Sequence, residues 1–310
     1  MKNSEYRENI FAVLFLIIPT ILLLTGFFFF PDIISDETRQ MLAIPLFSGL
    51  ILLMVGFILK KEVIASKIKI IGWVIFTFYW AVQPKTLYFS EDGDFVNAFI
   101  CIIGVYVLFY IAYHEWLSTQ RKEYVSCLNW IAGASAIAGL IYFGIELTPL
   151  SLWLREIVAS QSGWLLNVFT GGVQVNGVYI KYKLASIMII FACTAVQSFV
   201  IFIGMILSLQ HVDKKRKIYG LLVTVLPVYF LNLVRNAGVV YLVGIYGSDF
   251  FGMAHNIIGK SGSLIALIIL LFILIKIVPE VFDEIMCLTD LYKRNGPMEK
   301  LLKKMFLGRR

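Results

Sequence analysis

The sequence predicts an all-α polytopic membrane protein of about eight transmembrane helices, with a small extracytoplasmic β-hairpin before the sixth. Of its 310 residues, 59% are hydrophobic and 15% are charged, and the mean hydropathy is +0.84. Soluble domains carry about 25% charged residues. The apolar residues gather in blocks, and a helix of about 20 apolar residues is long enough to cross the hydrocarbon core of a bilayer.

Eight blocks are candidate transmembrane helices. The third is short and holds Trp73, Tyr79 and Trp80, so it could instead be an interfacial or tilted helix. The blocks predict N-terminal helices 1 to 5 over 1–145, an extracytoplasmic segment over 146–184, helices 6 to 8, which carry the candidate site residues, over 185–283 and a tail over 284–310. The eight blocks cover residues 10–30, 41–59, 68–82, 95–113, 125–145, 185–209, 218–246 and 257–279.

The loop charges predict which side of the membrane each segment faces. Most of the 27 lysines and arginines lie at the termini and in alternate loops, and such cations accumulate on the cytoplasmic side. The other loops carry two acidic clusters, Asp32/Asp36/Glu37 and Glu91/Asp92/Asp94. Both termini are therefore expected in the cytoplasm, and topology explains the net charge of +7 without a nucleic-acid partner. The predicted cytoplasmic cations include Lys2, Arg7, Lys60, Lys61, Lys67, Lys69, Arg121, Lys122, Lys214, Lys215, Arg216, Lys217, Lys293, Arg294, Arg309 and Arg310.

The basic tail, 284–310, alternates cations with apolar residues such as Leu291, Met298 and Leu302. This pattern predicts an amphipathic helix on the inner membrane surface, where its cations could contact anionic lipid head groups. A disordered tail is the alternative.

The outer segment, 146–184, is too long for a simple loop. Its first part carries Trp153, Trp164 and Phe169, which suit an interfacial helix. Its second part places Asn176-Gly177 between short alternating stretches, and Asn-Gly is a strong signal for a two-residue hairpin turn. We therefore expect an interfacial helix and then a β-hairpin that leads directly into the sixth transmembrane helix.

Two basic residues, Arg235 and Lys276, are left over once the cations at the termini and in the loops are assigned. Lys276 lies near the inner end of the last helix and can extend its ammonium group to the membrane surface. Arg235 lies deeper in the seventh, with Asn232 and Asn236 beside it. A charge inside the membrane is costly and marks a functional site unless a structural partner neutralises it.

Cys193 is the candidate nucleophile. A free membrane cysteine is commonly a small buried apolar residue. Cys193 follows the hairpin, however, and Gln197, four residues later, would share its helix face. If the sixth helix enters from outside near Ala185, Cys193 is roughly 12 Å deep, and Arg235 is roughly 15 Å deep by the same rise per residue. The two side chains can therefore meet in the outer half of the bilayer.

His255 completes the candidate set. Of the three histidines, His114 and His211 fall at the inner face and only His255 falls at the outer one. A histidine at a helix start is more commonly a capping or surface residue, so His255 is a candidate only because it converges with Cys193 and Arg235.

These residue types suit attack on a peptide bond. A nearby cation or histidine favours the thiolate that attacks. A histidine can pass a proton to the leaving amine, and an arginine in a water-poor site can stabilise the oxyanion or the thiolate. Arg235 could equally hold a phosphate. No Cys-x-x-Cys, His-Glu-x-x-His or phosphate-binding glycine loop is present. The four cysteines, at 101, 127, 193 and 287, lie in or near predicted helices at different depths, so no disulfide, metal site or other cofactor is expected.

The ordered set of motifs resembles the exosortase/archaeosortase family over roughly residues 150–280, and the length and eight-helix frame are similar to its archaeal branch. The matching pieces are the Asn176-Gly177 hairpin, Ala192-Cys193-Thr194 with Gln197, Asn232 with Arg235-Asn236, and the outer His255.

The resemblance implies a membrane-embedded cysteine transpeptidase that needs no cofactor. Its substrates would be surface-layer-type glycoproteins with a C-terminal signal made of a short motif, a transmembrane helix and a basic cluster. The enzyme would cut near the motif and transfer the new C-terminus to a lipid amine. Carried onto this chain, Cys193 is the nucleophile, Arg235 the stabiliser and His255 the acid/base, with Thr194, Gln197, Asn232 and Asn236 in substrate-binding or supporting roles.

Two other classes stay open. A transporter or lipid carrier would use Arg235 to bind an anionic group within the membrane. A structural subunit would have no site, and substitutions at Cys193 and Arg235 would be tolerated.

Overall fold

The computed structural model describes residues 2–89 and 95–307. The predicted acidic cluster Glu91/Asp92/Asp94 and the last cations, Arg309 and Arg310, lie outside these residues, as do the side chains of Lys2 and Arg7. The chain forms two compact units, one of residues 1–136 with 284–310 and one of residues 137–283.

The prediction of an all-α polytopic membrane protein is confirmed. Within the described residues, seven helices are long and apolar enough to cross a membrane, instead of the eight expected. The third predicted segment is not short, because it belongs to a helix of 28 residues. The seven segments are Ile10–Phe29, Glu37–Ile58, Glu62–Phe89, Phe95–Arg121, Ser126–Glu146, Lys214–Tyr246 and Ser248–Ile277.

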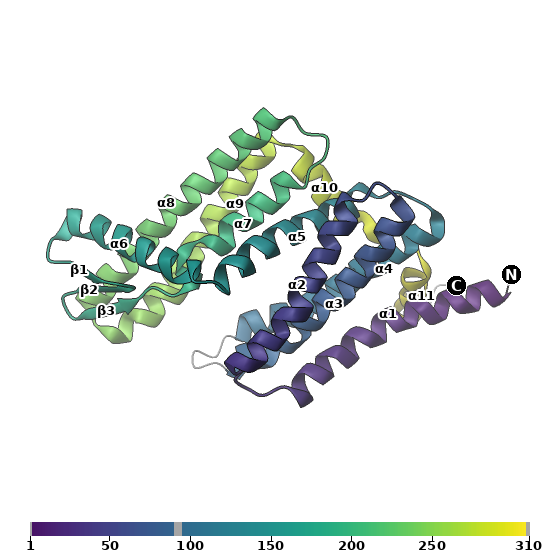
Figure 1. The fold of residues 1–310 in the computed structure, drawn as a ribbon, viewed down its shortest axis with the longest axis horizontal. Helices are drawn as coiled ribbons and strands as arrows, with labels where there is room; N and C mark the ends of the chain where they lie inside the picture. Colours follow the sequence, from purple (N-terminus) through teal and green to yellow (C-terminus); the bar gives the residue numbers. More distant parts are fainter. Residues whose placement is uncertain (1, 90–94, 308–310) are drawn as a thin grey trace. The chain divides into compact units, whose positions relative to one another are not determined.

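The first unit is a helical bundle built around α3 (Glu62–Phe89), which packs against α1 (Lys2–Phe29), α2 (Asp36–Ile58) and α4 (Phe95–Arg121). Helices α2, α3 and α4 lie side by side (Figure 1). A buried ion pair joins Lys69 of α3 to Glu115 of α4 at 2.7 Å. Asn129, in the first part of α5 (Ser126–Glu146), accepts a further hydrogen bond from Lys69.

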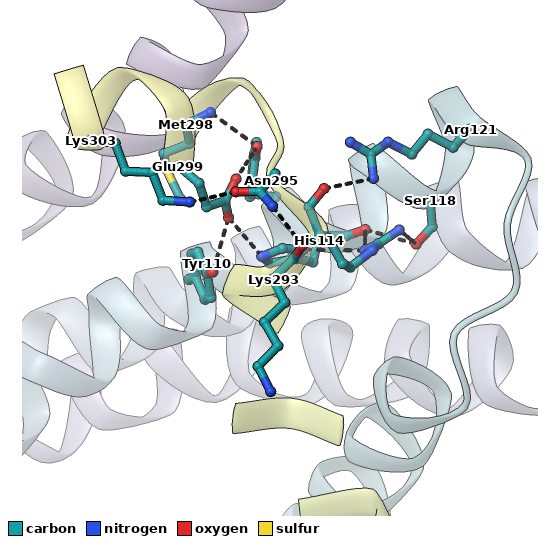
Figure 2. Close-up of polar contacts among 11 residues, drawn as sticks. Tyr110, His114, Ser118, Arg121, Lys293, Asn295, Met298, Glu299 and Lys303 are labelled. Carbon is teal, nitrogen blue, oxygen red and sulfur yellow. Dashed lines mark hydrogen bonds and ion pairs between the residues drawn. The ribbon is translucent and has the colours of Figure 1, made fainter. Parts of the chain in front are cut away.

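The C-terminal segment of this unit comprises the end of α10 (Glu280–Thr289), η4 (Asp290–Arg294) and α11 (Pro297–Leu307), so the expected tail helix is present at 297–307. The carboxylate of Glu299 is buried and accepts a 3.0 Å hydrogen bond from Tyr110 of α4 (Figure 2). Tyr113 of α4 donates a second 3.0 Å hydrogen bond to the same carboxylate. His114 Nε2 lies 3.1 Å from the same carboxylate. Polar contacts with α4 therefore hold the tail helix, while Lys303 is exposed.

A disulfide joins Cys127 of α5 to Cys287 of α10. The expectation that no disulfide would form is therefore wrong. It assumed that the cysteines lie at different depths, but the first turn of α5 and the C-terminal half of α10 bring these two together. Cys101 and Cys193 are free.

The second unit is built around α8 (Lys214–Tyr246), which packs against α6 (Leu150–Thr170), α7 (Val196–Leu207) and α9 (Lys260–Ile277). Helices α7, α8 and α9 run alongside one another (Figure 1). Arg216, near the start of α8, makes two 2.8 Å hydrogen bonds with Glu280 at the start of α10. The interfacial helix expected in the outer segment corresponds to α6.

A three-stranded antiparallel sheet follows α6. The expected hairpin is present as β1 (Gln174–Asn176) and β2 (Tyr179–Tyr182), in which Asn176 pairs with Tyr179. Gly177 occupies the turn at a φ of +55°, a conformation in which a Cβ atom would be strained. A third strand, β3 (Ala185–Met188), pairs with β2 and was not expected.

The sixth predicted transmembrane helix, 185–209, is therefore wrong as a single helix. Its first residues form β3, and η1 (Phe191–Thr194), a 3₁₀ turn, separates the strand from α7. Helix α7 has only 12 residues, a length of about 18 Å against a hydrocarbon core of about 30 Å.

Candidate functional site

Cys193 lies in η1, at the junction between the sheet and α7, outside the helices long enough to cross a membrane. Its side chain is buried in an apolar cluster that includes Val158 of α6, Ile180 of β2 and Val240 of α8. Ala195 follows at a φ of +65°, an uncommon backbone conformation for a non-glycine residue. Such conformations concentrate at active sites and are held by their surroundings.

Two asparagines of α8 hold the main chain of Cys193. Asn232 Nδ2 donates a 2.7 Å hydrogen bond to the Cys193 carbonyl oxygen, and Asn236 Nδ2 donates a 3.0 Å bond to the same oxygen. Both side chains are buried. The asparagines are four residues apart, so they project from one face of the helix. The two bonds fix the peptide that carries the thiol relative to α8.

Arg235 lies between these asparagines in sequence. Its Nε is buried and has no hydrogen-bond partner among the described residues. The side chain passes closely over Gly259, where an added Cβ atom would stand 3.0 Å from Arg235 Nε. Glycine at 259 therefore leaves the space that the guanidinium group occupies. The unsatisfied donor is a polar group available to a ligand or a reacting atom.

Arg155 of α6 is a site residue that the loop-charge argument missed. Its Nε donates a 2.8 Å hydrogen bond to the carbonyl oxygen of Ile189, four residues before Cys193. By sequence, Arg155 is one of the few cations in the loops predicted to lie outside. A better signal was its position beside Trp153 on a helix that carries no other cation.

The two arginines act on the thiol electrostatically. Burial raises the pKa of Cys193 and is the largest influence. A backbone hydrogen bond with Ile190 and the charges of Arg235 and Arg155 oppose it, but the pKa stays above its ordinary value. The resting group is therefore a thiol, and a base must take its proton before it can attack.

His255 lies in η3 (Met253–Gly259), a π-helical turn that packs against α8. π-helical turns are rare and occur frequently at functional sites. The His255 ring is partly buried and stacks on Phe251, with ring centroids 5.1 Å apart. Gly259, which contacts Arg235, lies four residues later in the same turn. The structure thus places His255 on the element that covers Arg235.

The remaining predicted residues, Thr194 and Gln197, lie beside Cys193 in sequence but in different surroundings. Thr194 is buried, and its hydroxyl donates a 2.7 Å hydrogen bond to the Phe191 carbonyl oxygen. Gln197 is exposed on α7. The expectation that Cys193 and Gln197 share one helix face is wrong, because the left-handed residue Ala195 interrupts the helix between them.

An apolar pocket of about 350 Å³ opens beside the residue that follows Cys193. It lies among α6, α7 and α8, and Thr194 and Tyr229 are among its lining residues. The apolar residues that define it include Trp153, Leu154, Ile157, Phe199 and Leu226. Its apolar lining suits an apolar group, such as a hydrocarbon chain.

The fold and the site define a polytopic membrane protein with a buried thiol, held by two asparagines and flanked by two arginines. The family model described as transmembrane exosortase matches residues 71–274, which is more than half of the chain and includes Cys193, Arg235 and His255. The chain therefore belongs to the transmembrane exosortase family. This family consists in general of membrane protein-sorting transpeptidases of the cysteine type. No curated protein and no solved structure matches the sequence.

Proposed function

We propose that this protein is a cysteine transpeptidase, similar to archaeosortase A, that cleaves a C-terminal sorting signal of surface proteins and transfers the new C-terminus to a lipid. The observation that carries the proposal is the pair of hydrogen bonds from Asn232 and Asn236 to the Cys193 carbonyl oxygen. They tie the thiol to the helix that bears Arg235, and the family match spans all four residues.

In the first half-reaction, His255 takes the Cys193 proton and the sulfur attacks the carbonyl carbon of the scissile peptide bond. Arg235, whose Nε lacks a partner, stabilises the negative charge that develops on the substrate oxygen. His255 then gives its proton to the leaving amine, the carbon–nitrogen bond breaks, and a thioester on Cys193 remains.

In the second half-reaction, the amine of an acceptor lipid attacks the thioester carbonyl. His255 takes a proton from this amine, the carbon–sulfur bond breaks, and the proton returns to the Cys193 sulfur. The product is an amide between the substrate's new C-terminus and the lipid. The apolar pocket beside Thr194 supports this step, since it can seat part of a hydrocarbon chain.

The substrate class and the sidedness are parts of the same proposal. Surface-layer-type glycoproteins would present a short motif, a transmembrane helix and a basic cluster. The loop charges support cytoplasmic termini and a site that faces the extracytoplasmic side, because they leave the sheet and η1 on the side poor in cations. This sidedness requires the short helix α7 to return the chain to the cytoplasmic side, since the seven long helices alone would leave the termini on opposite sides.

A processing assay tests the function. Cells would express a tagged signal-bearing substrate with the wild-type protein or with Cys193→Ser, and Cys101→Ser, which alters the other free cysteine, is the matched control. We expect processing to stop in the first variant and to continue in the second. Normal processing by Cys193→Ser would overturn the proposal.

A transporter or lipid carrier is the second candidate, and the unpartnered Nε of Arg235 is the observation that favours it. Such a protein would need Arg235 to bind an anionic group but would not need a thiol. It predicts that Arg235→Ala abolishes function while Cys193→Ala has no effect. The transpeptidase predicts that both substitutions abolish function.

A further inference from the structure

A second group of reactive side chains lies in the other compact unit and has no part in the proposed reaction. Cys127 stands in the first turn of α5, and Glu284 and Cys287 stand one turn apart on α10. Their ligand atoms all lie within 4.8 Å of one another, which no other trio of histidine, cysteine and acidic residues in the described part of the chain achieves. Cys127 is fully buried, and the other two are partly buried.

We propose that, when the two cysteines are reduced, Cys127, Glu284 and Cys287 bind one divalent cation of the zinc type. Two thiolates and one carboxylate are ligands that zinc prefers, and three protein ligands leave a fourth tetrahedral position for water. A neutral disulfide gains nothing from a carboxylate beside both sulfur atoms, whereas a divalent cation requires anionic ligands. The inference does not depend on the proposed function.

The carboxylate is also oriented. Ser126 Oγ donates a 3.1 Å hydrogen bond to Glu284 Oε2. Partners that hold a ligand in this way are regular features of metal sites and improve their affinity.

The predicted sidedness makes the reduced state relevant. Cys127 follows the basic pair Arg121 and Lys122, and Cys287 precedes Lys293 and Arg294, so both cysteines belong to the predicted cytoplasmic side. Cytoplasmic thiols are generally kept reduced. A dithiol reductant supplies two electrons and two protons, the sulfur–sulfur bond breaks, and the reductant becomes a disulfide. The cation then displaces two protons from the thiols. Disulfide and metal therefore exclude each other, and either one links α10 to α5.

Cobalt binding tests the site, with Co²⁺ as a coloured substitute for zinc. The full-length protein in detergent would first be reduced. The reductant would then be removed under anaerobic conditions, and the protein would be titrated with Co²⁺. We expect one cobalt ion per chain with thiolate-to-cobalt absorption, displacement of cobalt by Zn²⁺, and no such absorption in the oxidised protein. Cys287→Ser should abolish the absorption, and Cys101→Ser, the matched control, should keep it. Glu284→Gln should weaken cobalt binding about tenfold or more.

Two results would overturn the inference. One is the absence of thiolate-to-cobalt absorption in the reduced wild-type protein, including the case in which cobalt binds as an adventitious ion only. The other is an absorption that Cys287→Ser retains. Because a substitution can disturb folding, reduced wild-type protein whose thiols are blocked with N-ethylmaleimide gives an independent check, and it too should lose the absorption.

Discussion

The side-chain amide of Asn232 donates a 2.7 Å hydrogen bond to the backbone carbonyl oxygen of Cys193, so a long helix of the bundle holds the residue that we propose as the nucleophile. Asn236 donates to the same oxygen, one turn further along α8. A carbonyl oxygen has two lone pairs and can accept both bonds. The position of the thiol relative to Arg235 therefore depends on these two amides.

The first prediction concerns Asn232. In Asn232→Ala, the peptide of Cys193 loses one of its two anchors, and we expect kcat to fall about tenfold to a hundredfold, since small displacements of catalytic groups have effects of this size. KM should change little. Asn232→Asp should be at least as damaging, because a carboxylate cannot donate to the carbonyl. The measurement is steady-state cleavage of a signal peptide.

The control is Asn167→Ala, which removes the hydrogen bond that the Val173 N–H donates to Asn167 instead. An unchanged kcat in both Asn232 variants would contradict the account.

The second prediction concerns the charge of Arg235. Since burial raises the pKa of Cys193 and Arg235 lowers it, Arg235→Gln should raise this pKa further. The pH dependence of thiol alkylation should then move to higher pH, so alkylation at a fixed neutral pH should slow. The measurement uses a Cys101→Ser background with the Cys127–Cys287 disulfide kept oxidised, so that one free thiol remains. Arg155→Gln should give a smaller shift in the same direction. Identical alkylation profiles with and without Arg235 would show that its charge does not reach the thiol.

The third prediction concerns Gly259. A Cβ atom there would stand 3.0 Å from Arg235 Nε and 3.2 Å from the Ala254 carbonyl oxygen. Gly259→Ala should therefore displace the guanidinium group and lower kcat by about tenfold or more. Gly262→Ala adds the same methyl group one turn away, where nothing lies within 4 Å, and it should leave kcat unchanged. Equal activities of the two variants would contradict the proposed position of Arg235.

The fourth prediction concerns the tail helix. Burial alone would raise the pKa of Glu299. The neighbouring His114 ring, a hydrogen bond from the backbone N–H of Glu299 and the hydrogen bond from Tyr110 lower this pKa to about 2. A lowered carboxyl pKa contributes stability above its unfolded value of about 4.3, and this stability is lost as the pH falls toward 2.

Glu299→Gln should therefore reduce the free energy of unfolding near neutral pH by about 1–3 kcal/mol, the range for hydrogen bonds to a charged group. The difference from the wild type should shrink as the pH falls below about 4. Thermal unfolding of both proteins across this pH range measures this difference in stability. Asp290→Asn is the control, because its ion pair with Lys293 is exposed and such pairs contribute little. A stability difference that stays constant with pH would contradict the lowered pKa of Glu299.

The sequence predicted the features that have a strong local signal. Blocks of apolar residues indicated the long helices, and Asn176-Gly177 indicated the hairpin. The break at 185–195 was missed, because a continuous apolar stretch does not distinguish a buried strand from a helix. The third strand exists because Ala185–Met188 pairs with β2, a tertiary contact that no local pattern reveals.

The candidate site was predictable in part. The sequence placed Asn232, Arg235 and Asn236 on one helix and Cys193 near them. It did not indicate that the asparagines bind a backbone oxygen, since that contact depends on the 3₁₀ turn at Cys193. Arg155 and the Cys127–Cys287 pair were missed for the same reason: each depends on contacts between segments far apart in sequence.

The most direct test of the central claim is mass spectrometry of the bond that Cys193 is proposed to form. Wild-type protein mixed with a signal-bearing substrate and quenched in acid should yield a Cys193 peptide with the substrate's new C-terminus attached through a thioester, and hydroxylamine should release it. The same substrate recovered from cells should carry a lipid at that C-terminus. If the substrate is processed but no acyl group is ever found on Cys193, the proposed role of Cys193 as the nucleophile is wrong.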